Sequence, residues 1–182
     1  MLHLKDTFTS LESRFPEPLA LIITKSNNEQ VNFCPVGYFS LVSYKPLIWA
    51  VAVYKKHFTN KVIKETKDFV LCLPSVEQTK DVLYSGSVHG YIEDKSKKVS
   101  FKQITIAESR IPLIDESIAC FICNVMKEIE VGDHTLFCGE IKYSYISDKK
   151  WSDKIYNLDN KKLGNIKYGN TFEIIDYSPE DT

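Results

Sequence analysis

The sequence of 182 residues has no long hydrophobic run and no excess of charge of either sign. Its longest apolar segments, residues 19–23 and 47–53, are far shorter than the roughly 20 residues that a membrane-spanning helix needs. Lys and Arg number 23 against 24 Asp and Glu, so no basic surface for a nucleic acid is indicated. The N-terminal segment has no apolar core typical of a signal peptide. We therefore expect a cytoplasmic protein that binds neither nucleic acid nor membrane.

Glycine is scarce as well, with 7 residues in the chain, and the nucleotide-binding motifs GxGxxG and GxxxxGK[ST] are absent. Those motifs hold a phosphate against a glycine loop at the start of a helix. Their absence argues against a doubly wound α/β fold of the nucleotide-binding kind. A bound phosphate would instead have to be held by strand ends and a helix start.

Cysteine occurs in an odd number, 5, within apolar segments at positions 34, 72, 120, 123 and 138. This pattern is typical of reduced, buried thiols rather than of a disulfide framework. Cys120 and Cys123 form a CxxC pair, but the run SIACFICNV favours a strand, in which this spacing directs the two sulfurs to opposite faces. No second Cys or His pair completes a zinc site, so we expect no metal.

What the sequence does contain is a large number of short apolar segments. Hydrophobic residues make up 43% and aromatic residues 12% of the chain, which is enough for one core, and we expect a single domain over residues 1–182. The pattern predicts a mainly β fold with short helices, arranged as a barrel or a sandwich. Strands are expected at residues 19–25, 30–33, 39–44, 47–53, 69–73, 101–106, 118–131, 134–146 and 171–175, and helices at residues 60–67 and 75–83.

The segments between these elements carry turn signals. Residues 4–14 are interpreted as an entry helix or a loop, residues 111–114 as an extended connection, and residues 84–98 as a surface loop, because the last have glycines and charges without a period. Thr59 or Asn60 is the expected cap of the helix over residues 60–67. Gly132 and Asp133 join the last two long strands as a hairpin.

The stretch from Asn32 to Asn60 is the most informative. Gly37, close to Pro35, allows backbone amides to approach a planar group closely. The segment KKHFTN, which starts at Lys55, brings positive charge and hydroxyl groups to a helix start, where free N–H groups favour a phosphate. The residues alone therefore indicate a β-barrel-like domain that binds a flat ligand with an anionic tail.

Several motifs occur in an order that suggests a family. They are PLALIIT from Pro18, NFCPVGYFSLVS from Asn32, Pro46, HFT from His57, IKETKDF from Ile63, PS from Pro74, PLIDE from Pro112, Cys123, GDH from Gly132 and GEI from Gly139. This order resembles the flavin reductase-like, FMN-binding split-barrel family, which includes the flavoredoxins, over roughly residues 15–146. The resemblance implies an antiparallel six-stranded split β-barrel, a homodimer, and FMN bound near the subunit interface.

The resemblance also implies a set of site residues. The isoalloxazine ring would lie against a backbone segment made of Asn32, Cys34, Pro35, Val36, Gly37, Tyr38 and Phe39. The ring or the ribityl chain would be flanked by Val53 and Tyr54, and the phosphate would be reached by Lys55, His57 and Thr59. A catalytic role falls to His134, beside the flavin where a nicotinamide would dock, in orienting the donor or stabilising the reduced ring.

Each of these residues also has a purely structural interpretation. Tyr38 is equally explained as a core aromatic residue, Thr59 as a helix cap, Lys55 as part of a solvated face and His134 as a turn residue. The sequence also departs from the family pattern, because Asp94 and Lys95 are followed by Ser where the family has Phe. The role of the segment over residues 84–98 is thus left open.

By resemblance, the protein is expected to be an FMN-dependent oxidoreductase. NAD(P)H would reduce the flavin, which would pass electrons to free flavin, iron or a protein partner. Two alternatives stay open. One is a flavoredoxin-like electron carrier that takes electrons from a redox protein without NAD(P)H turnover, and the other is a barrel that binds a ligand without redox chemistry.

Overall fold

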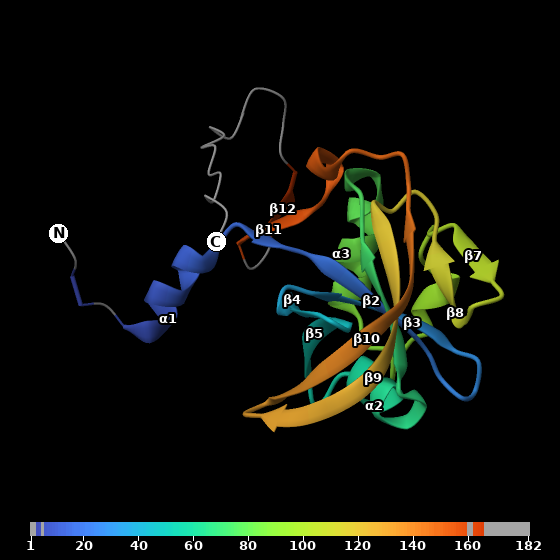
Figure 1. Ribbon diagram of the computed structural model, residues 1–182. Coiled ribbons are helices and arrows are strands. Elements are labelled where there is room, and N and C mark those ends of the chain that lie inside the picture. The colour runs from blue at the N-terminus through green and yellow to red at the C-terminus, as the bar shows by residue number, and fades with distance from the viewer. Residues whose placement is uncertain (1–2, 5, 160–161, 166–182) are drawn as a thin grey trace, which may run out of the picture.

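The computed structural model describes residues 3–4, 6–159 and 162–165, and within them the chain is mainly β (Figure 1). The strands are β1 (Glu17–Pro18), β2 (Ala20–Lys25), β3 (Val31–Val36), β4 (Phe39–Tyr44), β5 (Leu47–Tyr54), β6 (Asp68–Leu73), β7 (Gln103–Ile106), β8 (Ser109–Ile114), β9 (Ala119–Val131), β10 (His134–Ile146), β11 (Tyr156–Asp159) and β12 (Lys162–Gly164). The helices are α1 (Thr7–Leu11), α2 (Phe58–Thr66) and α3 (Thr79–Ser87), with short 3₁₀ turns η1 (Glu12–Arg14), η2 (Val76–Gln78), η3 (Lys95–Lys97) and η4 (Trp151–Asp153).

The main sheet is antiparallel and contains seven strands in the order β3-β2-β6-β9-β10-β5-β4. Each of its strands corresponds to a segment expected from the sequence, so the predicted mainly β, antiparallel architecture is confirmed, with one more strand in this sheet than the six implied by resemblance. The chain passes from β3 to β4 through a bend at Gly37 and Tyr38. This bend joins the two edge strands of the sheet.

The sheet is buried on both faces at β2, which explains the continuous apolar run at residues 19–23. Leu21 and Ile23 of β2 belong to one hydrophobic cluster, which also contains Val82 of α3. Ala20 and Ile22 belong to a second cluster, which contains Ile63 of α2. Because successive side chains of a strand point to opposite faces, a strand between two cores has to be apolar at every position.

The long hairpin of β9 and β10 is confirmed, with Gly132 and Asp133 at its turn (Figure 1). Cys120 of β9 lies in the first cluster and Cys123 in the second, so the prediction that their sulfurs face opposite sides is confirmed. Among the residues described by the structure, no group of three or more His, Cys, Asp or Glu is placed to hold a metal ion.

Two local predictions are wrong. Helix α2 begins at Phe58 with His57 as its N-cap, and neither Thr59 nor Asn60 caps it, because the His57 carbonyl accepts the N–H groups of Asn60 and Lys61 and closes the first turn earlier. The segment over residues 84–98 is not a surface loop throughout. It includes the end of α3 and the turn η3, and Ser85 and Lys95 within it are 1% and 5% exposed.

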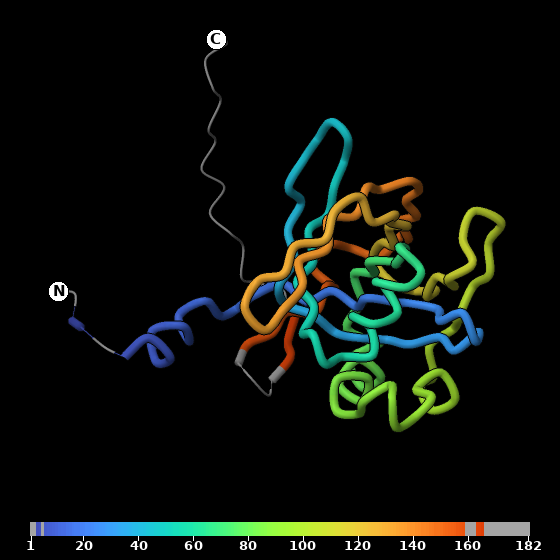
Figure 2. Tube along the Cα trace, turned by 90° about the horizontal axis from the view of Figure 1, so that it is seen from below, coloured from blue at the N-terminus to red at the C-terminus, as the bar shows by residue number. Residues whose placement is uncertain are grey.

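The smaller elements agree only in part with the predictions from the sequence. The entry segment forms α1 and η1 and stands away from the rest of the molecule, as Figure 2 shows from below. The expected connection at residues 111–114 is part of β8, which pairs with β7. The strand expected at residues 171–175 lies outside the described residues. No helix in the described part of the chain is long and apolar enough to cross a membrane.

Candidate functional site

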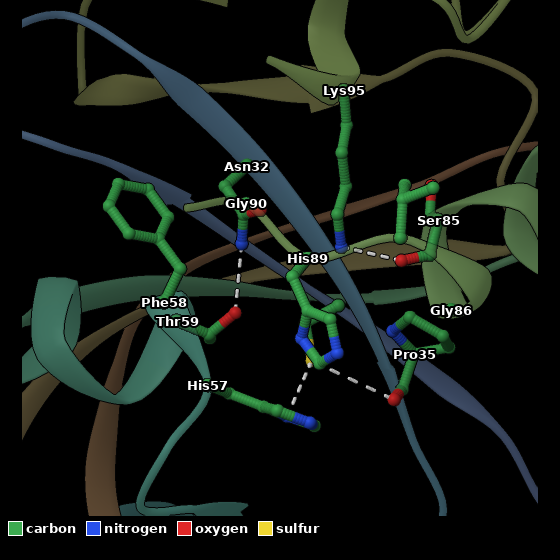
Figure 3. A pocket seen from close by; sticks show the side chains of 12 residues that line it. Asn32, Pro35, His57, Phe58, Thr59, Ser85, Gly86, His89, Gly90 and Lys95 are labelled. Carbon is green, nitrogen blue, oxygen red and sulfur yellow. Dashed lines mark hydrogen bonds between the residues drawn. The ribbon is translucent and has the colours of Figure 1, made fainter. Parts of the chain in front are cut away.

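A pocket of about 380 Å³, counted with its open mouth, lies between β3, the start of α2 and the segment from the end of α3 to η3. Figure 3 shows the side chains that converge on it. It is lined by Asn32, Cys34, Pro35, His57, Phe58, Thr59, Ser85, Gly86, Val88, His89, Gly90 and Lys95. None of these lining residues is acidic, whereas three carry basic groups. The pocket is therefore suited to an anionic ligand rather than to a cation.

The ammonium group of Lys95 joins two walls of the pocket. Lys95 is 5% exposed, and its Nζ donates a hydrogen bond of 2.9 Å to the carbonyl oxygen of Phe33 on β3. It donates a second bond, of 2.5 Å, to the carbonyl oxygen of Ser85 on α3 (Figure 3). Burial lowers the pKa of Lys95 from its ordinary value. A charged group at this depth is tolerated because carbonyl oxygens replace the water it loses. The segment that carries Lys95 is thereby fixed against the sheet.

Asn32 on β3 and Thr59 on α2 line another part of the pocket. The Nδ2 group of Asn32 donates a hydrogen bond of 2.8 Å to Oγ1 of Thr59, in the first turn of α2. The Oδ1 atom of Asn32 is buried and has no partner among the described residues, and the same is true of Oγ of Ser85. Buried polar atoms are nearly always paired in native proteins. Two unpaired polar groups around one pocket fit a site that is completed by a polar ligand.

The two imidazoles of the pocket come from different elements. His57 is the N-cap of α2, His89 follows α3, and their ring centroids are 6.1 Å apart. Burial, and then electrostatic interactions with His89, Lys95 and His134, lower the pKa of His57. These effects favour the neutral imidazole in the free protein, and an anion bound beside it would favour the protonated form.

Cys34 also lies in this pocket, with its sulfur 3.7 Å from Nδ1 of His57. Burial raises the pKa of the Cys34 thiol despite the opposing effects of Thr59 and Lys95. Because the thiolate and not the thiol is the nucleophile, Cys34 is not activated for covalent catalysis. The redox or transfer chemistry of such a site has to come from a bound group.

A row of aromatic rings leads away from the pocket. It starts at His57 and continues through Tyr54 and His134 to Tyr38, with centroid separations of 5.4, 5.6 and 5.7 Å. Tyr38 is 51% exposed, so the row reaches the surface. The Nδ1 atom of His134 lies 2.6 Å from a carboxylate oxygen of Asp133, which fixes the ring at the start of β10.

The structure thus brings five of the residues expected from the sequence into one pocket, namely Asn32, Cys34, Pro35, His57 and Thr59. Four more of them, Val36 to Phe39, lie outside the pocket lining, where β3 leads into β4. Val36 belongs to the second core cluster, and a Cβ added to Gly37 would lie 2.7 Å from a carboxylate oxygen of Glu17. The ring of Tyr38 packs against His134, and that of Phe39 packs against Trp49. Tyr54 and His134 form the aromatic row, and Val53 is buried in the core. Their proposed roles toward a cofactor stay predictions.

Lys55 is placed differently from the other predicted residues. Its ammonium lies 2.7 Å from a carboxylate oxygen of Glu130 and donates to the carbonyl of Gly132 at 2.7 Å. Hydrogen bonds from Lys55 and Lys64 lower the pKa of Glu130 to about 2. The positive charge expected next to a phosphate is therefore balanced locally by the β9–β10 hairpin.

Sequence reasoning missed the third wall of the pocket, which is formed by Ser85, Gly86, Val88, His89, Gly90 and Lys95. These residues lie in the segment SGSVHGYIEDK, residues 85–95, whose apolar residues follow neither a helical nor a strand period. The reason is that the pocket decides which of its positions are buried. The available signal was the pair of Gly86 and Gly90, which flank Ser87, Val88 and His89. A Cβ on Gly90 would lie 2.5 Å from Oδ1 of Asn32, so glycine is required there for the walls to approach.

The fold is that of an antiparallel β-barrel protein, and its pocket is lined by basic and no acidic residues. The model of the family described as flavin reductase like domain matches residues 12–163. The chain belongs to this flavin reductase-like family.

Two relatives illustrate the match. An uncharacterized protein of Archaeoglobus fulgidus is 32% identical over 155 residues, covering 85% of this chain and 87% of the relative. A ferric-chelate reductase (NAD(P)H) from the same organism is 26% identical over 123 residues, covering 67% of this chain and 71% of the relative.

Solved structures have the same fold. Flavoredoxin from Methanosarcina acetivorans matches with a TM-score of 0.78 and 22% identity, covering 99% of this chain and 94% of the other. An FMN-binding protein from Thermus thermophilus matches with a TM-score of 0.80 and 18% identity, covering 91% and 95%. At these identities the likeness establishes the fold.

Replacing Lys95 by Met tests the role of its ammonium. The change leaves the Phe33 and Ser85 carbonyls without their donor, and we expect it to lower the free energy of unfolding by about 2 kcal/mol. Lys97→Met is the matched control, because the Lys97 side chain is 78% exposed, and it should change stability by less than about 0.5 kcal/mol. Urea unfolding measures both values. A Lys95→Met protein as stable as the wild type would contradict this account.

Proposed function

We propose that the protein binds FMN in this pocket and is an NAD(P)H-dependent flavin oxidoreductase. The observation that carries the proposal is a pocket without acidic lining residues, walled by a buried ammonium, two imidazoles and two unpaired polar atoms. Membership of the flavin reductase-like family supports a flavin as the ligand. The FMN-binding relative in fold, and the relative named as an NAD(P)H-dependent reductase, support the choice of FMN and of NAD(P)H.

In this proposal the phosphate of FMN lies at the start of α2. The first N–H groups of a helix have no partner within the helix and carry partial positive charge. The Thr59 hydroxyl accepts from Asn32, so its own proton is available to a phosphate oxygen. His57 stands at the N-cap and can take up a proton when the anion binds. These groups recognise a phosphate without a glycine-rich loop.

The ring of the flavin would extend toward the segment from Pro35 to Phe39 and the aromatic row. Tyr54 and His134 offer flat surfaces, and the half-exposed Tyr38 marks the open end of the row. We assign His134 to positioning the nicotinamide of the donor against the ring, since it lies next to Tyr38 and its orientation is fixed by Asp133. Bound FMN supplies the hydride and electron chemistry that none of the protein side chains provides.

The acceptor of the electrons is proposed to be free flavin, iron or a protein. The relative named as a ferric-chelate reductase supports iron. A flavoredoxin-like carrier that receives electrons from a redox protein is the alternative, supported by the fold shared with a flavoredoxin. The two differ in whether a reduced nicotinamide reacts with the bound flavin.

We also propose that the protein is a homodimer. Val42 and Tyr44 on edge strand β4, and Leu47 at the start of β5, are 54%, 80% and 44% exposed. These three apolar side chains at one sheet edge are suited to burial against a second copy. The Tyr38 end of the aromatic row precedes the same strand.

The proposed activity is tested by anaerobic reduction. Purified protein reconstituted with FMN should lose its visible flavin absorbance when NADH or NADPH is added. Dithionite provides the positive control for a reducible flavin. Bleaching by dithionite but by neither nicotinamide would overturn the reductase assignment and favour the carrier. Failure to retain any flavin would overturn both.

The phosphate site is tested at Thr59. Thr59→Val removes the hydroxyl and keeps the shape, and it should weaken FMN binding about tenfold, in line with one charge-assisted hydrogen bond. Riboflavin, which has no phosphate, should bind to this variant almost as well as to the wild type. Thr59→Ser keeps the hydroxyl and should retain FMN. Equal losses for FMN and riboflavin, measured by fluorescence titration, would contradict a phosphate role.

A further inference from the structure

Two buried cysteines face each other on adjacent strands, away from the pocket lining. Cys72 of β6 is directly opposite Cys120 of β9 in the antiparallel register, and their sulfurs are 2.9 Å apart. Cys72 is 0% and Cys120 4% exposed. The CxxC spacing draws attention to Cys120 and Cys123, but the fold gives Cys120 a different neighbour, 48 residues away in the chain.

Cys72 and Cys120 occupy a non-hydrogen-bonded pair of the β6–β9 ladder, the kind of pair at which opposite side chains are closest. The N–H of Val125 donates to the carbonyl of Lys67, which marks this pair as a hydrogen-bonded position at the end of the ladder. Hydrogen-bonded and non-hydrogen-bonded pairs alternate in an antiparallel ladder, and the register from Asp68 to Leu73 is unbroken. Counting from Lys67 places Cys72 and Cys120 at a non-hydrogen-bonded pair. The Cα separation at such a pair, about 4.5 Å, is within the range that a disulfide spans.

The other thiols are separated from this pair. Cys123 and Cys34 lie in the second core cluster, on the opposite face of the sheet from Cys72 and Cys120. Cys138 is on β10, opposite Lys127 of β9. A bond between Cys72 and either cysteine of the second cluster would have to pass through the sheet, so the fold permits one pairing for Cys72.

We propose that Cys72 and Cys120 are a redox-active pair that a hydroperoxide converts to a disulfide. The Cys120 thiolate attacks one oxygen of hydrogen peroxide, the O–O bond breaks, and hydroxide leaves and is protonated to water. The Cys72 sulfur then attacks the sulfenic sulfur, the S–O bond breaks, and a second water leaves with the Cys72 proton. Two thiols lose two electrons in total, and one hydrogen peroxide becomes two waters.

The environment of the pair assigns the order of these steps. Cys120 retains slight exposure and Cys72 has none, so a water-sized oxidant reaches Cys120 first. The hydrogen bond from the Cys72 thiol lowers the pKa of Cys120, whereas burial raises the pKa of Cys72. Cys120 is therefore the attacking thiolate and Cys72 the resolving thiol. Burial also protects the sulfenic acid from a second peroxide.

The test is a mass-spectrometric map of the full chain after treatment with hydrogen peroxide, with blocking of free thiols before unfolding. Digestion with trypsin and chymotrypsin separates Cys120 from Cys123, because Phe121 lies between them. We expect a peptide linked through Cys72 and Cys120, with the loss of two hydrogen atoms, which disappears after dithiothreitol. Absence of the link, or a link from Cys72 to Cys123, would overturn the proposal.

Cysteine variants test the same reaction independently. Cys123→Ser should keep the link, and Cys120→Ser should abolish it and leave Cys72 reduced. The disulfide closes a loop of 48 residues, so oxidised wild-type protein should melt several degrees higher than the reduced form. Cys120→Ser should show no such shift after peroxide. An equal shift in wild type and in Cys120→Ser would show that the pair is not responsible.

Discussion

The buried ammonium of Lys95 is the interaction on which the site depends. Its two acceptors, the carbonyls of Phe33 and Ser85, belong to β3 and α3, so this ammonium ties the segment after α3 to a strand of the main sheet. A charge with both acceptors in place is stable at this depth, whereas either carbonyl alone would leave it poorly compensated. The positive charge of Lys95 is therefore held in place by carbonyls of the protein itself.

The rest of the site is arranged around that charge. At one end, α2 presents its N-terminus and Thr59, and at the other the aromatic row leads through Tyr54 and His134 to the surface. A ligand that satisfies both ends has an anionic tail and an extended planar head, which is the chemistry of FMN. Because Cys34 is held as a thiol and His57 as a neutral imidazole, the protein contributes binding and orientation, and the cofactor contributes the electron transfer.

Much of this was predictable from the sequence. All seven strands of the main sheet carry local patterns, and the pocket residues from Asn32 to Thr59 lie within one stretch whose turn and charge signals can be interpreted directly. The contribution of Lys95 could not be predicted, because one of its two acceptors, the Phe33 carbonyl, lies 62 residues away in the chain. The start of α2 was misplaced for a related reason: Thr59 has the residue type of a cap, but its hydroxyl is used by Asn32. The local pattern identifies a hydroxyl at a helix start, and tertiary contacts decide its partner.

The structure of the protein with FMN bound is the most direct test of the central claim. In that structure the phosphate should lie within hydrogen-bond distance of the Thr59 hydroxyl and the first N–H groups of α2, with Lys95 still bonded to Phe33 and Ser85. The ring should lie on the side of Tyr54 and His134. FMN bound elsewhere on the molecule, with the pocket unchanged and empty, would contradict the account.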